Sequence, residues 1–207
     1  MTQLYRGVLF DLLTALLDSW TVWDRVAGSP NAGRRWRAAY LELTYGCGAY
    51  RPYETLVREA AVATGLSAAC ADELEAAWDD LAPWDDAHGL LAQLAGRYRL
   101  GIVTNCSERL GRRAASALGI PLDVVVTAER AGYYKPDPRP YRLALAELGL
   151  PPASVAFVAG SGFDLIGTAA VGMPALWHNR AGIAKPPQAP APLAERRTLR
   201  ELAALLH

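Results

Sequence analysis

The chain has 207 residues, 52% hydrophobic and 20% charged, which is enough apolar material for one medium-sized globular domain or a core with one insertion. Lys and Arg together number 21, as do Asp and Glu, so no net charge attracts nucleic acid or an anionic membrane. Three scattered cysteines, a start without a signal peptide and no apolar run of roughly 20 residues favour a cytoplasmic protein without a membrane segment.

The first predicted element is a strand over residues 4–10, which are nearly continuous in apolar character and are expected to be buried on both faces. Asp11 follows this run directly. In an open parallel sheet, ligands bind beyond the carboxyl ends of the strands, so Asp11 stands where a nucleophile or a metal ligand would lie. The alternative is that Asp11 only caps the helical segment that follows it.

Residues 15–84 are rich in alanine at helical spacing and contain no convincing strand, which predicts an inserted helical unit. We expect three helices in its later part: one with Asn31 as N-cap that ends near residues 46–48, one over residues 52–64, and one that Ser67 begins and Pro83 terminates.

The first of these three helices has two stripes. Arg37 and Leu41 share one face, whereas Trp36 and Tyr40 lie on another that we expect to pack against neighbouring helices. Arginines commonly occupy solvated helix faces, so Arg37 has two interpretations, a surface cation or a cation directed at a site. Trp20 and the other early tryptophans are expected to pack this helical unit or a subunit contact.

The remainder of the chain alternates between strands and helices, a pattern typical of an α/β fold with a parallel sheet and helices on both faces. The predicted strands cover residues 98–104, 122–127, 154–159 and 174–178, and the predicted helices cover residues 87–95, 107–118, 138–148 and 163–171. A proline-rich surface segment, 185–192, and a closing helix, 193–206, complete the chain.

Side chains that can take part in catalysis lie in four loops that follow the ends of predicted strands. Asp11 can serve as a carboxylate nucleophile if a cation keeps it ionised, and Lys135 can supply that cation. Asp164 can hold Lys135 or position a water molecule, while Thr104 and Asn105 can donate hydrogen bonds to an anionic substrate. Simpler interpretations remain open, because Lys135 precedes a turn-forming proline cluster and Asp164 can be a carboxylate at a helix N-terminus.

Several ordered motifs across nearly the whole chain carry a resemblance to a known family. They are Phe10-Asp11, Val103-Thr104-Asn105, Tyr134-Lys135-Pro136-Asp137, the stretch Phe157–Asp164, and Trp177-His178-Asn179-Arg180. This set resembles the haloacid dehalogenase (HAD) superfamily, and within it the L-2-haloacid dehalogenase branch. The resemblance implies a HAD-like Rossmannoid three-layer core over residues 1–14 and 85–207, a helical cap domain over residues 15–84, and a homodimer.

The resemblance offers two chemistries. Phosphatases of the superfamily use a second aspartate two residues after the nucleophile and an acidic magnesium ligand just after the fourth strand. Those positions are Leu13 and Gly160 here, and neither offers the side-chain oxygen that Mg²⁺ prefers. A phosphatase acting on a small phosphorylated metabolite with Mg²⁺ is therefore the disfavoured alternative.

The dehalogenase branch implies a hydrolase that acts on carbon–halide bonds without metal or other cofactor. Asp11 would displace halide from a small 2-halo carboxylic acid, and water would hydrolyse the resulting ester. Arg37 matches the cap arginine that receives the halide, and Lys135 and Asp164 complete the catalytic set. The implied substrate-binding residues are Leu12, Leu13, Thr14, Leu41, Thr104, Asn105, Tyr141, Ser161 and Phe163.

Three positions depart from the branch. The expected threonine four residues after the nucleophile is Ala15, with Thr14 one position earlier, the serine that ends the fourth strand is Ala159, and the expected asparagine is Ser161. These departures are compatible with a changed substrate or slow ester hydrolysis. A third possibility is a member of the fold with little catalytic activity, against which the retained Asp11, Lys135 and Asp164 argue.

Overall fold

A single six-stranded sheet forms the centre of the computed structural model, which describes residues 4–206. The strands are β1 (Gly7–Phe10), β2 (Arg99–Thr104), β3 (Val124–Thr127), β4 (Val155–Ala159), β5 (Ala175–His178) and β6 (Ala194–Arg196). Their order is β3-β2-β1-β4-β5-β6, and every neighbouring pair is parallel. The predicted α/β architecture is thereby confirmed.

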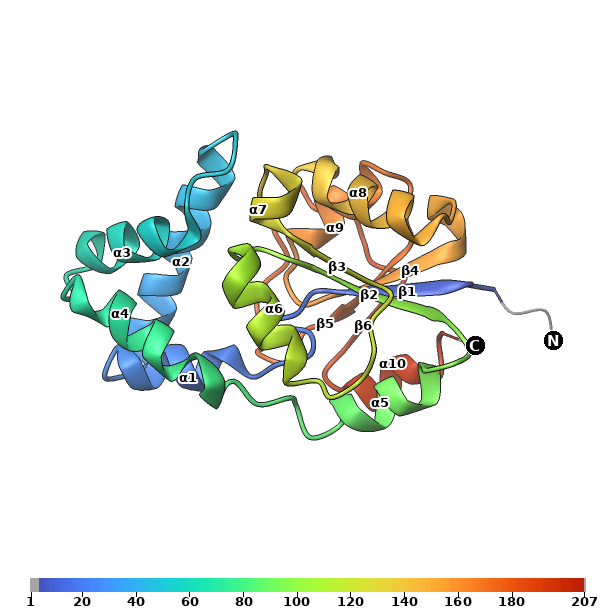
Figure 1. The fold of residues 1–207 in the computed structure, drawn as a ribbon, viewed down its shortest axis with the longest axis horizontal. Coiled ribbons are helices and arrows are strands. Elements are labelled where there is room, and N and C mark those ends of the chain that lie inside the picture. Colours follow the sequence, from blue (N-terminus) through green and yellow to red (C-terminus); the bar gives the residue numbers. More distant parts are fainter. Residues whose placement is uncertain (1–3, 207) are drawn as a thin grey trace.

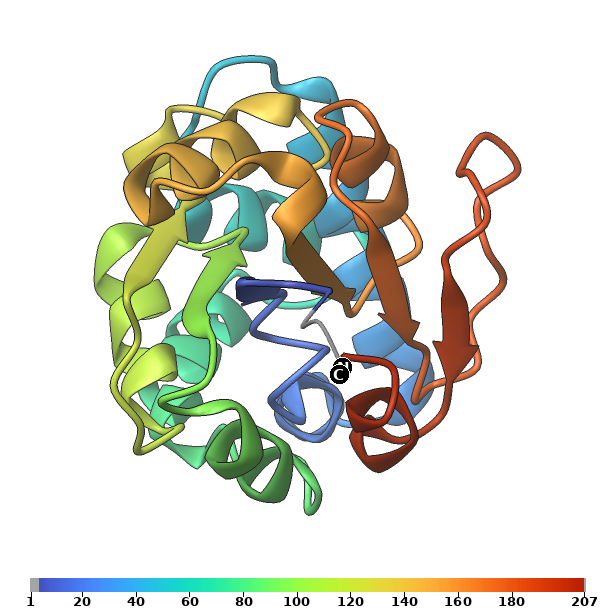
Figure 2. The same ribbon diagram turned by 90° about the vertical axis from the view of Figure 1, so that its right-hand side faces the viewer.

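Helices cover both faces of the sheet (Figure 2). The first face packs against α5 (Ala87–Leu94), α6 (Glu108–Ser116) and α10 (Leu199–Ala203), and the second against α8 (Pro138–Leu148) and α9 (Asp164–Ala169). Successive strand residues point to opposite faces, so Val8 and Phe10 of β1 join the first core while Leu9 joins the second. The burial of β1 on both faces explains its uninterrupted apolar sequence.

Residues between β1 and α5 form a separate group of packed helices beside the sheet (Figure 1). They are α1 (Ser19–Val26), α2 (Pro30–Gly46), α3 (Tyr53–Ala63), α4 (Ala69–Ala76) and the short 3-10 helix η1 (Ala77–Asp80), and we call them the inserted helices. Aromatic side chains hold the group together, for example Trp23 and Trp36 with ring centroids 4.6 Å apart. None of the helices in residues 4–206 is long and apolar enough to cross a membrane.

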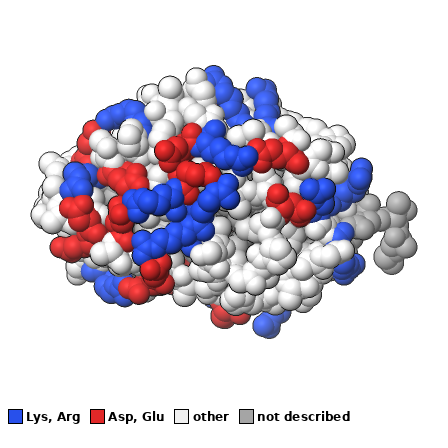
Figure 3. Space-filling model, viewed as in Figure 1, with Lys and Arg blue, Asp and Glu red and all other residues white. Residues whose placement is uncertain are grey.

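Several contacts fix the inserted helices to the sheet domain. The two chain segments that connect the inserted helices to the sheet domain run side by side, and the Asp18 N–H donates to the Ala82 carbonyl oxygen over 2.8 Å. On the face drawn in Figure 3, basic and acidic side chains lie next to one another. Arg109 of α6 pairs with Glu75 of α4 at 2.8 Å. Trp78 adds a buried hydrogen bond of 2.9 Å to the Leu110 carbonyl oxygen. These contacts set the position of the inserted helices over the sheet.

The structure corrects three sequence predictions. Ser29, not Asn31, is the N-cap of α2, because Ser29 is extended and its side chain accepts the Ala32 N–H, while Pro30 needs no hydrogen-bond acceptor at the first helical position. Residues 193–206 were predicted as one closing helix, but in the structure they form the strand β6 followed by the short helix α10. Pairing with β5 supplies backbone hydrogen-bond partners to β6. Two short helices were also missed, α7 (Ala128–Ala131) and the 3-10 helix η2 (Pro152–Ser154).

Candidate active site

The carboxyl ends of the central strands meet at one edge of the sheet, which faces the inserted helices (Figure 1). Phe10 is in register with Ile102 of β2 and Val158 of β4, so the residues that follow these strands are neighbours. Asp11 follows β1, Asn105 follows β2, and the loop after β4 leads to Asp164 at the start of α9. The parallel register therefore brings together groups that lie about 60 to 150 residues apart in sequence.

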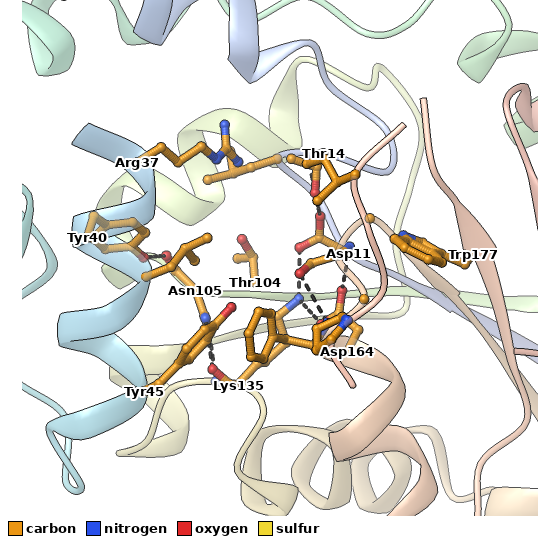
Figure 4. Close-up of a pocket in the computed structure, with 18 of the residues that line it drawn as sticks. Asp11, Thr14, Arg37, Tyr40, Tyr45, Thr104, Asn105, Lys135, Asp164 and Trp177 are labelled. Atoms are coloured by element: carbon orange, nitrogen blue, oxygen red, sulfur yellow. Dashed lines mark hydrogen bonds and ion pairs between the residues drawn. The ribbon is translucent and has the colours of Figure 1, made fainter. Parts of the chain in front are cut away.

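Lys135, from the loop between α7 and α8, is positioned between two carboxylates (Figure 4). Its Nζ lies 2.8 Å from Oδ1 of Asp11 and 2.9 Å from Oδ1 of Asp164. The Tyr141 hydroxyl donates to the same Oδ1 of Asp164 over 2.9 Å. Asp11, Lys135 and Asp164 are each no more than 7% exposed, so water screens this charged cluster poorly.

The environment shifts the pKa values of the two carboxyl groups in opposite directions. Burial acts to raise the pKa of Asp11, but the charge of Lys135 and the hydrogen bonds from Lys135 and Thr14 bring it below its ordinary value. Burial raises the pKa of Asp164, the charge of Lys135 opposes this rise, and the charge of Asp11 adds to it, so the pKa ends above its ordinary value. Burial alone would lower the pKa of Lys135, but both carboxylates raise it. Such a separation is typical of a nucleophile and a base that share one site.

The two oxygens of Asp11 have different surroundings. Oδ2 accepts three hydrogen bonds, from the Thr14 hydroxyl at 2.6 Å, the Thr14 N–H at 3.0 Å and the Ala15 N–H at 3.2 Å. Oδ1 contacts only Lys135 among the described residues. Asp11 thus makes the cap-like contacts of its simpler interpretation and still presents one oxygen to the cavity.

Asn105 holds the loop that carries Lys135. Its side-chain Nδ2 donates to the Lys135 carbonyl oxygen over 3.1 Å, and its Oδ1 accepts the Lys135 N–H over 2.7 Å. The Asn105 carbonyl oxygen in turn accepts the Tyr40 hydroxyl at 2.8 Å, which links the inserted helices to this loop. Thr104, at the end of β2, is 1% exposed and lines the cavity beside it.

Arg37 of α2 reaches the same cavity from the inserted helices. Its Nη1 donates to Ser19 Oγ over 2.7 Å, the Ser19 hydroxyl donates to the Leu13 carbonyl oxygen, and its guanidinium lies 4.3 Å from the centre of the Trp20 ring. Arg37 is only 8% exposed, yet no carboxylate in residues 4–206 forms an ion pair with it. Burial lowers the pKa of Arg37. A buried guanidinium without an acidic partner is ready to receive an anion.

These groups enclose a cavity of about 130 Å³ between the sheet edge and the inserted helices. It is lined by the predicted residues Asp11, Leu13, Thr14, Arg37, Leu41, Thr104, Asn105, Lys135, Ser161, Phe163 and Asp164. Two predicted substrate-binding residues lie elsewhere. Leu12 is fully buried in the hydrophobic core, and Tyr141 is buried behind Asp164, so neither lines the cavity.

Sequence reasoning missed several wall residues. They are Trp20, Tyr40, Tyr45, Gly160, Gly162, Trp177, Ile183, Ala184 and Pro186. Trp20 was expected to pack the helical unit or a subunit contact, and Tyr40 to pack against neighbouring helices. Pro186 lies in the segment 185–192, which was expected to lie on the surface. The excess of aromatic residues in α1 and α2 was the available signal, but it did not indicate which rings face the sheet.

The residues around Asp11 do not fit a magnesium ion. Leu13 is apolar, and at Gly160 a Cβ atom would lie 2.2 Å from Thr14 Oγ1 and 2.5 Å from Asp11 Oδ2, so an acidic side chain has no room there. Lys135 already occupies the space between the two nearest carboxylates. Residues 4–206 contain no group of three or more His, Cys, Asp or Glu arranged to hold a metal.

The fold and the site define a class of hydrolase with an aspartate after the first strand and a lysine beside it. The family model for haloacid dehalogenase-like hydrolases matches residues 7–172, and the chain belongs to this family.

Individual relatives place the chain more narrowly. It is 29% identical to (S)-2-haloacid dehalogenase H-109 of Pseudomonas putida, with 97% of each chain covered. A solved dehalogenase with an intermediate complex superposes with a TM-score of 0.86 at 28% identity, covering 99% of this chain and 98% of that one. The L-2-haloacid dehalogenase of Xanthobacter autotrophicus gives a TM-score of 0.83 at 25% identity over 98% of both chains. The resemblance to the L-2-haloacid dehalogenase branch is thereby confirmed.

Proposed function

We propose that this protein is a metal-independent hydrolase that displaces halide from a small 2-halo carboxylic acid. The observation that carries this proposal is the pair formed by Asp11 and Arg37 on one small cavity: a carboxylate whose Oδ1 is held by Lys135 alone among the hydrogen-bond donors of residues 4–206, and a buried cation without an acidic partner in those residues. A nucleophile and an anion receptor on one cavity suit a displacement that releases an anion.

In the first step, Oδ1 of Asp11 attacks the halogen-bearing carbon of the substrate, and the carbon–halogen bond breaks as the new carbon–oxygen bond forms. Lys135 keeps Asp11 ionised, while the three donors on Oδ2 hold the carboxylate in place. The departing halide takes the electron pair to Arg37, whose weakly hydrated guanidinium suits a soft anion. Asn105 and Phe163 line the same cavity as Arg37. The substrate carboxylate is held by Thr104 and by the main-chain N–H groups of Leu12 and Leu13, since the Thr14 N–H already donates to Asp11.

In the second step, a water molecule attacks the ester carbonyl carbon of Asp11. Asp164 accepts the water proton, because its raised pKa suits it to act as a base. The bond between the ester carbonyl carbon and the substrate oxygen then breaks, the leaving alkoxide takes the proton back from Asp164, and the new carboxylic acid of Asp11 releases its proton to solvent to return to a carboxylate. Tyr141 and Lys135 hold Asp164 by its Oδ1 during this step.

The inserted helices act in this proposal as a cap domain over the catalytic core. They contribute Arg37 and the Ser19 contact that orients it, and they form one wall of the cavity. The homodimer and the cytoplasmic location stay predictions from the sequence, and the mass of the purified protein in solution tests the first.

The experiment is halide release from the separate enantiomers of 2-chloropropionate and from 2-bromo and 2-fluoro acids, in buffer containing EDTA. We expect halide from the (S) enantiomer without added metal, and we expect Asp11→Asn to lower the rate by on the order of 10³ or more. Asp18→Asn, on the connector outside the cavity, serves as the control. Release of phosphate from phosphomonoesters only when Mg²⁺ is present, with no halide from any haloacid, would contradict the proposal.

A further inference from the structure

Tyr45 lines the cavity and has no part in the mechanism proposed above. It lies in the last turn of α2, and its ring packs against Phe163 with the ring centroids 4.4 Å apart. Phe163 belongs to the loop between β4 and α9, which carries Ser161 and leads directly to Asp164. Tyr45 therefore brings a phenol from the inserted helices to the loop that holds the candidate base.

Polar groups as well as the Phe163 ring lie near the phenol, since Tyr45, Ser161 and Asp164 line the same cavity. Burial raises the pKa of Tyr45, the charge of Asp164 raises it further, and a hydrogen bond with the Ser161 side chain acts in the opposite direction. The phenol consequently stays protonated and can donate a hydrogen bond. Ser161 Oγ itself accepts the Phe163 N–H over 3.2 Å, which fixes the serine hydroxyl beside the ring.

One carboxylate oxygen of Asp164 can accept a further hydrogen bond. Its Oδ1 accepts from both Lys135 and Tyr141 at 2.9 Å, whereas its Oδ2 accepts, within residues 4–206, only the Ser161 N–H, over a long 3.3 Å. A buried carboxylate oxygen with one weak donor can accept a further hydrogen bond, and a water molecule is the smallest group that can supply it.

We propose that Tyr45 is a positioning residue for the water that hydrolyses the Asp11 ester, and that it holds this water together with Ser161 and Asp164 Oδ2. This inference rests on the proposed function. The water gives its proton to Asp164 Oδ2 and its electron pair to the ester carbonyl carbon, while the Tyr45 hydroxyl hydrogen-bonds the water oxygen.

The test is Tyr45→Phe, which keeps the ring on Phe163 and removes only the hydroxyl. Rapid-quench measurement of halide in the first turnover reports ester formation, and steady-state halide release together with the intact mass of the quenched protein reports ester hydrolysis. We expect an unchanged first-turnover burst, a steady-state rate lower by about tenfold, equivalent to one hydrogen bond, and accumulation of protein carrying the carboxyalkyl group on Asp11. Ser161→Ala is expected to give the same pattern.

Tyr50→Phe is the matched control, since Tyr50 stacks on Tyr134 outside the cavity and its loss should change neither phase. Equal loss of burst and steady-state rate in Tyr45→Phe, or no change in either, would overturn the inference alone. Absence of both halide and adduct in the unmodified protein would overturn the proposed function and the inference with it. Thermal unfolding of Tyr45→Phe, expected to match the parent protein, separates a folding defect from either result.

Discussion

Thr14 donates its hydroxyl hydrogen to Oδ2 of Asp11 over 2.6 Å. The resemblance to the dehalogenase branch places a threonine one position later, where this chain has Ala15. In the turn after β1 the Ala15 side chain is fully buried, whereas its N–H still reaches the same oxygen at 3.2 Å. The hydroxyl contact to Asp11 is therefore present, supplied from the neighbouring position.

Replacing Thr14 with valine tests this contact, because valine keeps the shape of threonine and removes the hydroxyl. A hydrogen bond to a charged group contributes about 1.5–3 kcal/mol, so we expect the first-turnover rate of halide release to fall by roughly 10- to 100-fold. Thr14→Ser keeps the hydroxyl and should retain most of the activity. Equal activity in the valine and parent proteins would show that the two backbone donors suffice to hold Asp11.

Replacing Arg37 is expected to lower activity without lowering stability. Its buried guanidinium has no acidic partner among the residues that the structure describes, so Arg37→Met removes a charge that is costly to bury, and the free energy of unfolding should stay level or rise. Halide release should fall by on the order of 10² or more, because the leaving anion loses its receptor. Urea unfolding and halide assays measure the two effects, with exposed Arg34→Met of the same helix as the control. Retained activity in Arg37→Met would contradict the anion-receptor role.

The pH dependence of turnover should have its acid limb set by Asp164. Its pKa is raised above the ordinary value of 3.8, and it must be ionised to accept a proton, so activity is lost as pH falls through this raised pKa. The pKa of Lys135 is raised above 10.5, so Lys135 stays charged and should cause no loss below that pH. The Tyr141 hydrogen bond lowers the pKa of Asp164, and Tyr141→Phe should therefore move the acid limb to higher pH. A limb that stays in place in this variant would exclude Asp164 as the titrating group.

Loss of Lys135 should destabilise the fold in a pH-dependent way. Lys135→Met leaves Asp11 and Asp164 buried without a cation, which costs about 3–5 kcal/mol at neutral pH. Without the cation, burial raises the pKa of both carboxyl groups above their unfolded values, so stability is highest below the unfolded pKa and falls as pH rises through the folded one.

The deficit relative to the parent protein should accordingly be smaller at pH 5 than at pH 7. Urea unfolding at the two pH values measures it. Lys185→Met is the control, since Lys185 is exposed and its replacement should change stability by about 0.5 kcal/mol or less. A deficit that does not depend on pH would indicate lost packing and not unpaired charge.

Local signals in the sequence were sufficient for much of the fold. The helix predicted over residues 138–148 has these bounds in the structure, because Pro138 suits its first turn and Gly149 adopts the positive φ that ends it. Asp11 could be singled out because an apolar strand ends directly before it. Edge pairing is a long-range interaction, and for that reason β6 was mistaken for part of a helix.

The order of the motifs by itself determined the fold class and the candidate Asp11, Lys135 and Asp164. Only the tertiary structure decided that Thr14 substitutes for the expected threonine, that Leu12 faces the core, and which side chains close the cavity above the sheet edge. The physical reason is that the residues that follow the carboxyl ends of the strands can be located from local sequence and parallel topology. The cavity wall, in contrast, is made by contacts between segments distant in sequence. Periodicity shows that a side chain such as Tyr45 or Trp20 has an apolar surface to bury, and the packed structure determines the surface against which it lies.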